Sequence, residues 1–192
     1  MINRLEATRY LVQHLSDEPI IASCGNPKFD LFSAAGERKA NFYMWNSMGM
    51  ASSIGLGLAL SRPEKKVIVL DGDGAILMNL NSLTTAASKA APNLVHVIWD
   101  NEQYQITGGQ HTHTSEKADI GAIAKGAGFK KVLTIQTMDA FKEAFSQVYS
   151  QPGPWIIVAK TDSSGAPGRP PKSPVYIKNR FMAALSKSED IP

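Results

Sequence analysis

Short apolar blocks alternate with amphipathic blocks along the chain, and the two kinds predict strands and helices in turn. The most apolar blocks, 67–70 and 94–99, are typical of strands buried on both faces of a parallel sheet. Four more blocks have strand-like length and composition: 19–24, 41–45, 131–135 and 155–159. Between them we expect helices over 2–15, 28–35, 50–60, 118–127 and 138–150. The alternation predicts an α/β fold with a doubly wound, mostly parallel sheet of about five or six strands and helices on both faces.

The C-terminal part of the chain has a different pattern. Residues 161–174 are rich in glycine and proline, which indicates a connecting segment and not a helix or strand of the core. Residues 176–187 have the pattern of an amphipathic helix, and we expect the last five residues to fray. The sequence therefore predicts one domain over 1–175, followed by a C-terminal helix and tail over 176–192.

Composition narrows the class of protein. With 192 residues the chain is long enough for one domain with a sizeable core. No run of about 18 apolar residues predicts a membrane helix, and a net charge of +3 is too small to indicate nucleic-acid binding. A single cysteine, Cys24, excludes an intramolecular disulfide and a multi-cysteine metal cluster within this chain. We expect a cytoplasmic protein, because a reducing compartment suits such cysteine usage.

Two polar side chains follow the two most apolar strands. Asp73 lies in Gly72-Asp73-Gly74, just after the first, and Asn101 follows the second. The connection between the strands is long enough for one helix, so the strands are expected to be parallel and roughly 5 Å apart. Their carboxyl ends then meet at one edge of the sheet, where ligands of open α/β folds bind.

The chemistry of this pair favours a metal–diphosphate site. A carboxylate and an amide oxygen suit Mg²⁺, which often bridges to phosphate, and Gly72 and Gly74 allow the backbone to approach a diphosphate closely. Taken alone, the tripeptide favours a tight strand-to-helix turn; the paired strands and Asn101 at the matching place reverse that preference. Asn26, after the strand-like block 19–24, could reach the same edge, although a plain turn with Asn26 as helix N-cap explains it equally well.

The helix expected over 50–60 contains several small residues, including Gly55 and Gly57. Glycine inside a helix costs up to about 1 kcal/mol relative to alanine. This composition indicates either close packing against the sheet or a backbone that lies near a ligand.

The order of these motifs resembles the thiamine-diphosphate-dependent decarboxylase family. Gly72-Asp73-Gly74, a spacer and then Asp100-Asn101 is similar to the family signature, with Asp100 in place of the first of two asparagines. The resemblance implies that Asp73 and Asn101 bind Mg²⁺ through their side chains and that Gln103 adds a backbone carbonyl. It also implies that Ala75, at a position often occupied by serine, meets the diphosphate through its backbone, and that Tyr104 lies at the cofactor.

A second motif supports the same resemblance. Asn46-Ser47-Met48-Gly49 is similar to a family motif whose large apolar residue bends the cofactor into a V shape. By this resemblance Met48 supports the bent cofactor, Asn46 contacts its pyrimidine through a carbonyl, and Ser47 belongs to the same loop. Without the flanking pattern, Met48 would be interpreted as simple core filling.

The resemblance covers about residues 19–160, the diphosphate-binding (PP) domain of the family. It looks closest to the β subunit of sulfopyruvate decarboxylase and the C-terminal half of phosphonopyruvate decarboxylase. His111 stands where we expect proline after Gly108-Gly109-Gln110, which bears on the substrate. His111 and His113 are candidate proton donors or carboxylate partners, because imidazole titrates near neutrality; solvated loop histidines are the simpler alternative.

The family's catalytic glutamate lies on a second, PYR-type domain, and this chain is expected to be too short to hold both. The resemblance therefore implies a β-type subunit that binds thiamine diphosphate and Mg²⁺ and shares its active site with a separate PYR-domain α subunit. The expected reaction is decarboxylation of a small 2-oxo acid, an anionic 3-substituted pyruvate such as sulfopyruvate or phosphonopyruvate. A fixed cation should meet the substrate's acidic group, with Lys117 and Arg169 as candidates.

Two alternatives stay open at this point. The chain could serve another thiamine-diphosphate enzyme, either an acetolactate-synthase-like carboligase or a 2-oxo acid oxidoreductase. It could also be a non-catalytic cofactor-binding subunit. A plain dinucleotide-binding module is disfavoured, because no GxGxxG follows a predicted strand.

Overall fold

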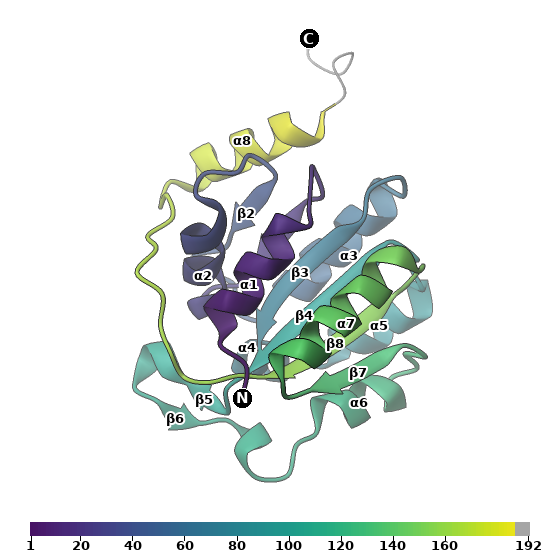
Figure 1. Cartoon of the computed structure of the whole chain (residues 1–192). Coiled ribbons are helices and arrows are strands. Elements are labelled where there is room, and N and C mark those ends of the chain that lie inside the picture. Colours follow the sequence, from purple (N-terminus) through teal and green to yellow (C-terminus); the bar gives the residue numbers. More distant parts are fainter. Residues whose placement is uncertain (187–192) are drawn as a thin grey trace.

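The computed structural model describes residues 1–186 of the chain. At its centre lies a six-stranded sheet in the order β2-β1-β3-β4-β8-β7, in which every pairing is parallel (Figure 1). The doubly wound parallel sheet predicted from the sequence is confirmed. The strands of this sheet are β1 (Ile20–Ala22), β2 (Asn41–Tyr43), β3 (Val67–Gly72), β4 (Leu94–Asp100), β7 (Val132–Ile135) and β8 (Trp155–Lys160).

Helices cover both faces of the sheet (Figure 1). One face packs against α1 (Arg4–Gln13), α2 (Asn26–Ala35) and α7 (Met138–Ser150). The other packs against α3 (Ala51–Ser61), α5 (Asn81–Lys89) and α6 (Ile120–Gly126). The last helix, α8 (Pro174–Leu185), lies along the edge strand β2, where Phe181 meets Phe42 with ring centroids 5.2 Å apart.

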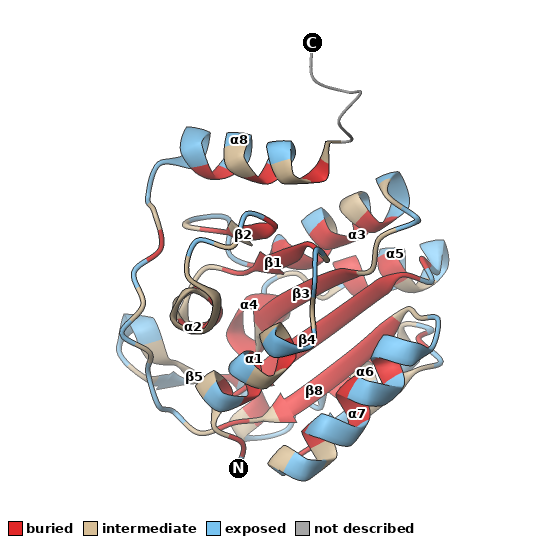
Figure 2. Ribbon diagram, turned by 45° about the horizontal axis from the view of Figure 1, so that its top comes forward, coloured by how far each residue is buried: buried red, intermediate tan, exposed pale blue. Residues whose placement is uncertain are grey.

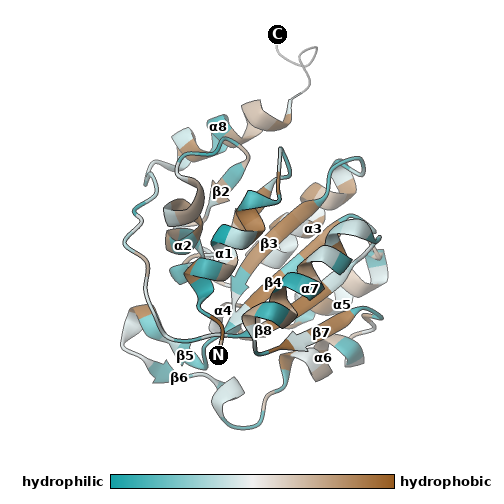
Figure 3. Cartoon of the chain, in the orientation of Figure 1, coloured by the Kyte–Doolittle hydropathy of each residue, from teal (hydrophilic) through white to brown (hydrophobic). Residues whose placement is uncertain are grey.

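The two central strands are apolar on both sides because each side faces a different helical layer. In β3, Ile68 and Leu70 join the core beneath α1 and α7, whereas Val67 and Val69 join the core beneath α3 and α5. Figure 2 shows these strands as buried, and Figure 3 shows the hydrophobic colouring concentrated in them. This two-sided burial is the physical reason for the uninterrupted apolar runs in the sequence.

Two connections differ from the expectation. The link between β3 and β4 holds two short helices, α4 (Asp73–Leu77) and α5, instead of one. Asn79 lies at the break, and its side-chain amide donates a hydrogen bond of 2.8 Å to the carbonyl of Gly49, which holds the chain out of a continuous helix.

The loop expected over 105–115 contains a small antiparallel hairpin. Its strands are β5 (Gln103–Tyr104) and β6 (Gln110–His111), and 3-10 turns cover Gln105–Thr107 and His113–Ser115. The C-terminal helix is present, with Ser173 as its N-cap, whereas the last five residues, 188–192, lie outside the described part. The boundary at residue 175 stays a prediction.

The chain reverses its direction of travel across the sheet between β1 and β3. From β1 it moves outward to β2, then returns past β1 to β3 and continues to β4. Such a switch leaves a crevice at the carboxyl ends of the strands. Among residues 1–186, no helix combines the length and the apolarity needed to cross a membrane.

The glycines of α3 have two different explanations. A Cβ on Gly55 would collide with Cγ2 of Val69 in β3, so this glycine lets the helix lie directly on the sheet. A Cβ on Gly57 would meet no atom within 4 Å. Close packing therefore explains Gly55, whereas Gly57 faces open space.

We predict opposite effects for two alanine substitutions in this helix. Gly55→Ala should lower the free energy of unfolding by roughly 1–3 kcal/mol, because the added methyl group overpacks the core against Val69. The matched control, Gly57→Ala, should raise it by up to about 1 kcal/mol, because alanine favours helix and nothing obstructs the methyl group. Urea unfolding of both variants measures the difference. Equal stability of the two would contradict the assigned packing.

Candidate functional site

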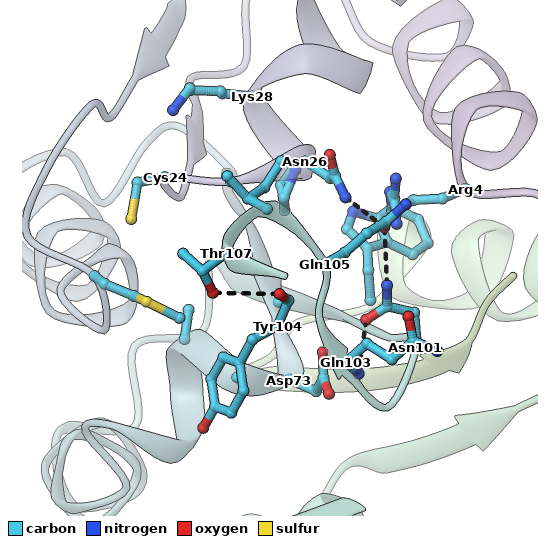
Figure 4. A pocket seen from close by; sticks show the side chains of 18 of the residues that line it. Arg4, Cys24, Asn26, Lys28, Asp73, Asn101, Gln103, Tyr104, Gln105 and Thr107 are labelled. Carbon is cyan, nitrogen blue, oxygen red and sulfur yellow. Dashed lines mark hydrogen bonds between the residues drawn. The ribbon is translucent and has the colours of Figure 1, made fainter. Parts of the chain in front are cut away.

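A cavity of about 250 Å³ opens at the carboxyl ends of the strands, at the switch point (Figure 4). Its wall is built from segments that follow β1, β2, β3 and β4 in the fold. The lining residues used below are Cys24, Asn26, Lys28, Trp45, Met48, Gly72, Asp73, Gly74, Ala75, Asn101, Gln103 and Tyr104. The cavity therefore brings together residues that are up to about 100 positions apart in the chain, from Arg4 to Thr107.

Asp73 is the first residue of α4 and is only 2% exposed. Its Oδ2 accepts hydrogen bonds from the hydroxyl groups of Thr112, at 2.5 Å, and Thr114, at 3.2 Å. Burial raises the pKa of Asp73 to about 6; the Thr112 hydrogen bond opposes this shift and the nearby charge of Asp100 adds to it. A carboxylate held in this way gains from any cation that reaches it.

Asp100, the residue that departs from the expected asparagine, has its own counter-charge. The Nζ of Lys160 lies 2.8 Å from Oδ2 of Asp100 and 2.8 Å from Oε1 of Glu102. The Thr114 hydroxyl lies 2.8 Å from Oδ1 of Asp100, so it links the two buried aspartates. The additional negative charge at this position is thus balanced by Lys160, and Asp73 is the carboxylate that faces the cavity.

Asn101 lies in the turn between β4 and the hairpin. Its Oδ1 accepts a hydrogen bond of 3.3 Å from the backbone N–H of Gln103, and its Nδ2 donates to Oε1 of Gln105 at 3.0 Å. The same Gln105 oxygen accepts from Nδ2 of Asn26 at 2.5 Å. Figure 4 shows Asp73, Asn101 and Gln103 gathered at one end of the cavity. The carboxyl ends of β3 and β4 thus bring Asp73 and Asn101 to one edge of the sheet, as predicted from the sequence.

The two glycines of Gly72-Asp73-Gly74 differ in their surroundings. A Cβ on Gly74 would lie 2.6 Å from Cδ1 of Tyr104, so the aromatic ring itself requires a glycine there. A Cβ on Gly72 would meet nothing within 4 Å, and its N–H donates to Oδ1 of Asp71 at 3.0 Å. A ligand therefore has room to contact the protein backbone at Gly72, whereas Gly74 makes room for the Tyr104 ring.

Met48 does not fill the core. It is 37% exposed, lines the cavity, and lies in a tight loop in which Ser47 has a φ of 60° and Gly49 a φ of 89°. Asn46 and Ser47 are exposed and do not line the cavity. Their expected contacts with the cofactor stay predictions, whereas the apolar side chain of Met48 is available to a ligand.

The hairpin turns its histidines and threonines in opposite directions. Thr112 and Thr114 are buried against Asp73, whereas His111 and His113 are exposed and absent from the cavity wall. The catalytic roles considered for these histidines stay predictions. Sequence reasoning missed the threonines, and the alternation in His111-Thr112-His113-Thr114 is the signal that could have found them.

The donor set at the Asp73 end fits a hard divalent cation. It offers the carboxylate of Asp73 and the amide oxygen of Asn101, both of which are oxygen ligands suited to Mg²⁺. Gln103 also lines this end, and the role of its backbone carbonyl as a third ligand stays a prediction. Within residues 1–186, no group of three or more His, Cys, Asp or Glu side chains could hold a metal ion. A cation in this cavity would thus depend on amide and carbonyl oxygens beside one carboxylate.

Comparison with known proteins agrees with this geometry. Residues 26–159 match the family model described as thiamine pyrophosphate enzyme, C-terminal TPP binding domain. The chain belongs to the thiamine pyrophosphate enzyme family. The family resemblance seen in the sequence is confirmed, and the matched range contains the segments that form most of the cavity wall.

Several members of the thiamine pyrophosphate enzyme family are similar to the chain. It is 40% identical over 187 residues to sulfopyruvate decarboxylase subunit beta of Methanocaldococcus jannaschii, covering 96% of this chain and 98% of that one. It is 34% identical to phosphonopyruvate decarboxylase of Streptomyces viridochromogenes, covering 93% of this chain but 45% of the relative. Benzoylformate decarboxylase of Polynucleobacter necessarius shares the fold, with a TM-score of 0.71 at 19% identity over 86% of this chain and 34% of that one.

We predict that Asp73→Asn stabilises the metal-free chain at neutral pH. The folded-state pKa of Asp73, about 6, lies above the ordinary 3.8. The free energy of unfolding of the parent therefore falls by up to roughly 3 kcal/mol as pH rises through that interval, because ionisation of Asp73 is unfavourable in the folded chain. The variant should therefore unfold at higher urea than the parent, with an advantage that grows between about pH 4 and pH 6 and levels off near neutrality.

Urea unfolding in the presence of EDTA measures this difference. Asp139→Asn, which removes an exposed carboxylate on α7, serves as the control and should show no such growth with pH. Parallel pH profiles for the parent and Asp73→Asn would contradict the burial of an uncompensated carboxylate.

Proposed function

We propose that the chain is the cofactor-binding, β-type subunit of a heteromeric decarboxylase that uses thiamine diphosphate and Mg²⁺. Its proposed substrate is an anionic 3-substituted pyruvate of the sulfopyruvate or phosphonopyruvate type. The observation that carries the proposal is the group of Asp73, Asn101 and Gln103 at one end of a cavity, within a chain whose full length resembles a sulfopyruvate decarboxylase subunit beta.

In this proposal each part of the site has a separate task. Asp73, Asn101 and the Gln103 carbonyl hold Mg²⁺ and with it the diphosphate, and Thr112 fixes the Asp73 carboxylate from behind. Met48 presents an apolar side chain to the organic part of the cofactor. When bound, thiamine diphosphate supplies the electron sink that loss of CO₂ from a 2-oxo acid requires.

The proposal includes a second polypeptide. Single-chain relatives such as phosphonopyruvate decarboxylase are about twice as long as the part that this chain matches. We infer that a separate PYR-domain α subunit takes the place of the remaining half, supplies the activating glutamate and completes the cavity. A cytoplasmic location of this complex fits the free thiol of Cys24.

An exposed apolar strip beside the cavity supports a partner at this place. We define the docking strip as Met48, Met50, Ile54 and Met78, whose side chains are all at least 37% exposed. Asn79, the residue after Met78, connects this part of the docking strip to Met50. The Asn79 amide donates a hydrogen bond to the carbonyl of Gly49 at 2.8 Å and lies 3.8 Å from the sulfur of Met50. Clustered apolar side chains of this kind mark interaction surfaces, and Met48 makes this strip continuous with the cavity.

A carboligase is the second candidate. The chain is 26% identical over 125 residues to acetolactate synthase of Bacillus subtilis, covering 62% of this chain. This likeness is weaker and shorter than that to the sulfopyruvate decarboxylase subunits, so decarboxylation is the preferred reaction.

Cofactor binding gives the first test. In calorimetry of the chain with its partner, thiamine diphosphate should bind only with Mg²⁺, and Asp73→Ala or Asn101→Ala should weaken it at least 100-fold, because each removes a metal ligand. Glu116→Ala, on the exposed loop after the hairpin, is the control and should keep full affinity. Unchanged affinity in Asp73→Ala and Asn101→Ala would refute the site.

Turnover of the same complex tests the reaction. Release of CO₂ and an aldehyde from sulfopyruvate or phosphonopyruvate is the expected result across a panel of 2-oxo acids. A complex that binds the cofactor yet releases CO₂ from none of them would refute the decarboxylase. Formation of acetolactate from pyruvate instead would favour the carboligase.

The docking strip leads to a further prediction. Ile54→Glu should weaken association with the partner at least tenfold, because a buried charge at the interface lacks a counter-ion. Leu60→Glu, an exposed position six residues further along α3 and thus on a different side of that helix, is the matched control. Co-purification and sedimentation measure the effect, and equal association of the two variants would place the partner elsewhere.

A further inference from the structure

Lys28 is a buried cation on the cavity wall that the assigned site does not use. It lies in the first turn of α2 and is 4% exposed. Its Nζ is 4.0 Å from the centre of the Trp45 ring and 4.7 Å from that of Phe29. Figure 4 shows Lys28 and Cys24 at the end of the cavity away from Asp73 and Asn101.

Nothing in the described chain neutralises this ammonium group. The ion pairs found within residues 1–186 involve other side chains, and no hydrogen bond from Lys28 to another side chain or carbonyl occurs in that part. Burial lowers the pKa of Lys28, and a cation in the first turn of a helix opposes the helix dipole. The two aromatic rings contribute about 0.5–2 kcal/mol each at most. A buried charge of this kind gains most from an anion that enters the cavity.

Two further cations lie beside the same rings. The guanidinium of Arg169 lies 5.1 Å from the centre of the Phe29 ring, and Nζ of Lys172 lies 5.6 Å from that of Trp45. Both belong to the glycine- and proline-rich segment 161–173, which is held in place by a 2.6 Å hydrogen bond from Nε1 of Trp45 to the carbonyl of Pro171. We call Lys28, Arg169 and Lys172 with these two rings the cation cage.

We propose that Lys28, the cage cation on the cavity wall, binds the sulfonate or phosphonate group of the substrate and is the specificity-determining residue. This inference rests on the proposed function. The cavity then carries the metal-binding carboxylate at one end and Lys28 at the other, so cofactor diphosphate and substrate acid occupy different ends. Of the two cations expected from the sequence, Arg169 meets the Phe29 ring from an exposed position and Lys117 is exposed as well; neither lines the cavity.

The cage also provides a reason for rejecting uncharged substrates. A pyruvate without the acidic substituent would enter the cavity and leave Lys28 unpaired and desolvated. Sites that rely on a polar contact discriminate strongly against analogues that lack it, because the buried group is then left without a partner. Discrimination by an unpaired buried group is stronger than the discrimination that pocket shape alone provides against one added or missing group.

The test uses the full chain in complex with its partner subunit, loaded with thiamine diphosphate and Mg²⁺. Calorimetry with 3-sulfopropanoate, an unreactive sulfonate, should show saturable binding that weakens at least tenfold in Lys28→Met and recovers in part in Lys28→Arg. Butanoate, which lacks the sulfonate, should bind parent and variant equally. Lys130→Met, an exposed lysine outside the cavity, should behave as the parent.

Measuring the affinity for thiamine diphosphate distinguishes failure of this inference from failure of the proposed function. In Lys28→Met this affinity should stay within about twofold of the parent, and circular dichroism should show an intact fold. A loss of cofactor affinity comparable to that of Asp73→Ala would assign Lys28 to the diphosphate and overturn the inference. Unchanged sulfonate binding in Lys28→Met, or none in a parent that binds the cofactor, would also overturn it. A parent that binds no thiamine diphosphate would instead refute the proposed function.

Discussion

The parallel pairing of β3 with β4 is the constraint on which the site depends. Gly72 lies opposite Trp99 in this register, so the chain leaves both strands at the same level and delivers Asp73 and Asn101 to one edge. A slip by one residue would turn every side chain of β3 to the opposite face and bury polar groups in the core. The apolar runs that stabilise the sheet thus also determine where the oxygen ligands lie.

The site and its surroundings contain both paired and unpaired charged side chains. Lys160 neutralises Asp100, and Arg4 pairs with the buried Asp30, which leaves Asp73 and Lys28 as buried charges on the cavity wall without an opposite charge within the described chain. Hydroxyl groups hold Asp73 and aromatic rings hold Lys28, so both are positioned without being neutralised. Fixed groups of this kind need little rearrangement when ligands bind.

The local sequence pattern was sufficient to predict the sheet and the end of the site that contains Asp73 and Asn101. Apolar blocks located the strands, and the residues after 67–70 and 94–99 located Asp73 and Asn101. The rest depended on distant contacts. The local sequence predicts a solvated lysine in the first turn of a helix at position 28, whereas in the folded chain Lys28 is buried and its Nζ lies against the distant Trp45 ring. The break between α4 and α5 depends on a bond to Gly49 across 30 positions, which no local propensity encodes.

Residues of segment 161–173 can change in evolution without disturbing the candidate metal ligands. The candidate metal ligands lie on sheet ends and a hairpin whose replacement would disturb the core, whereas Arg169 and Lys172 lie on a surface strap outside the sheet. Substitutions of these two exposed side chains cost little stability, because surface positions away from buried contacts tolerate change. Related enzymes could therefore adjust the surroundings of Lys28 through substitutions in this segment while the cofactor chemistry stays fixed.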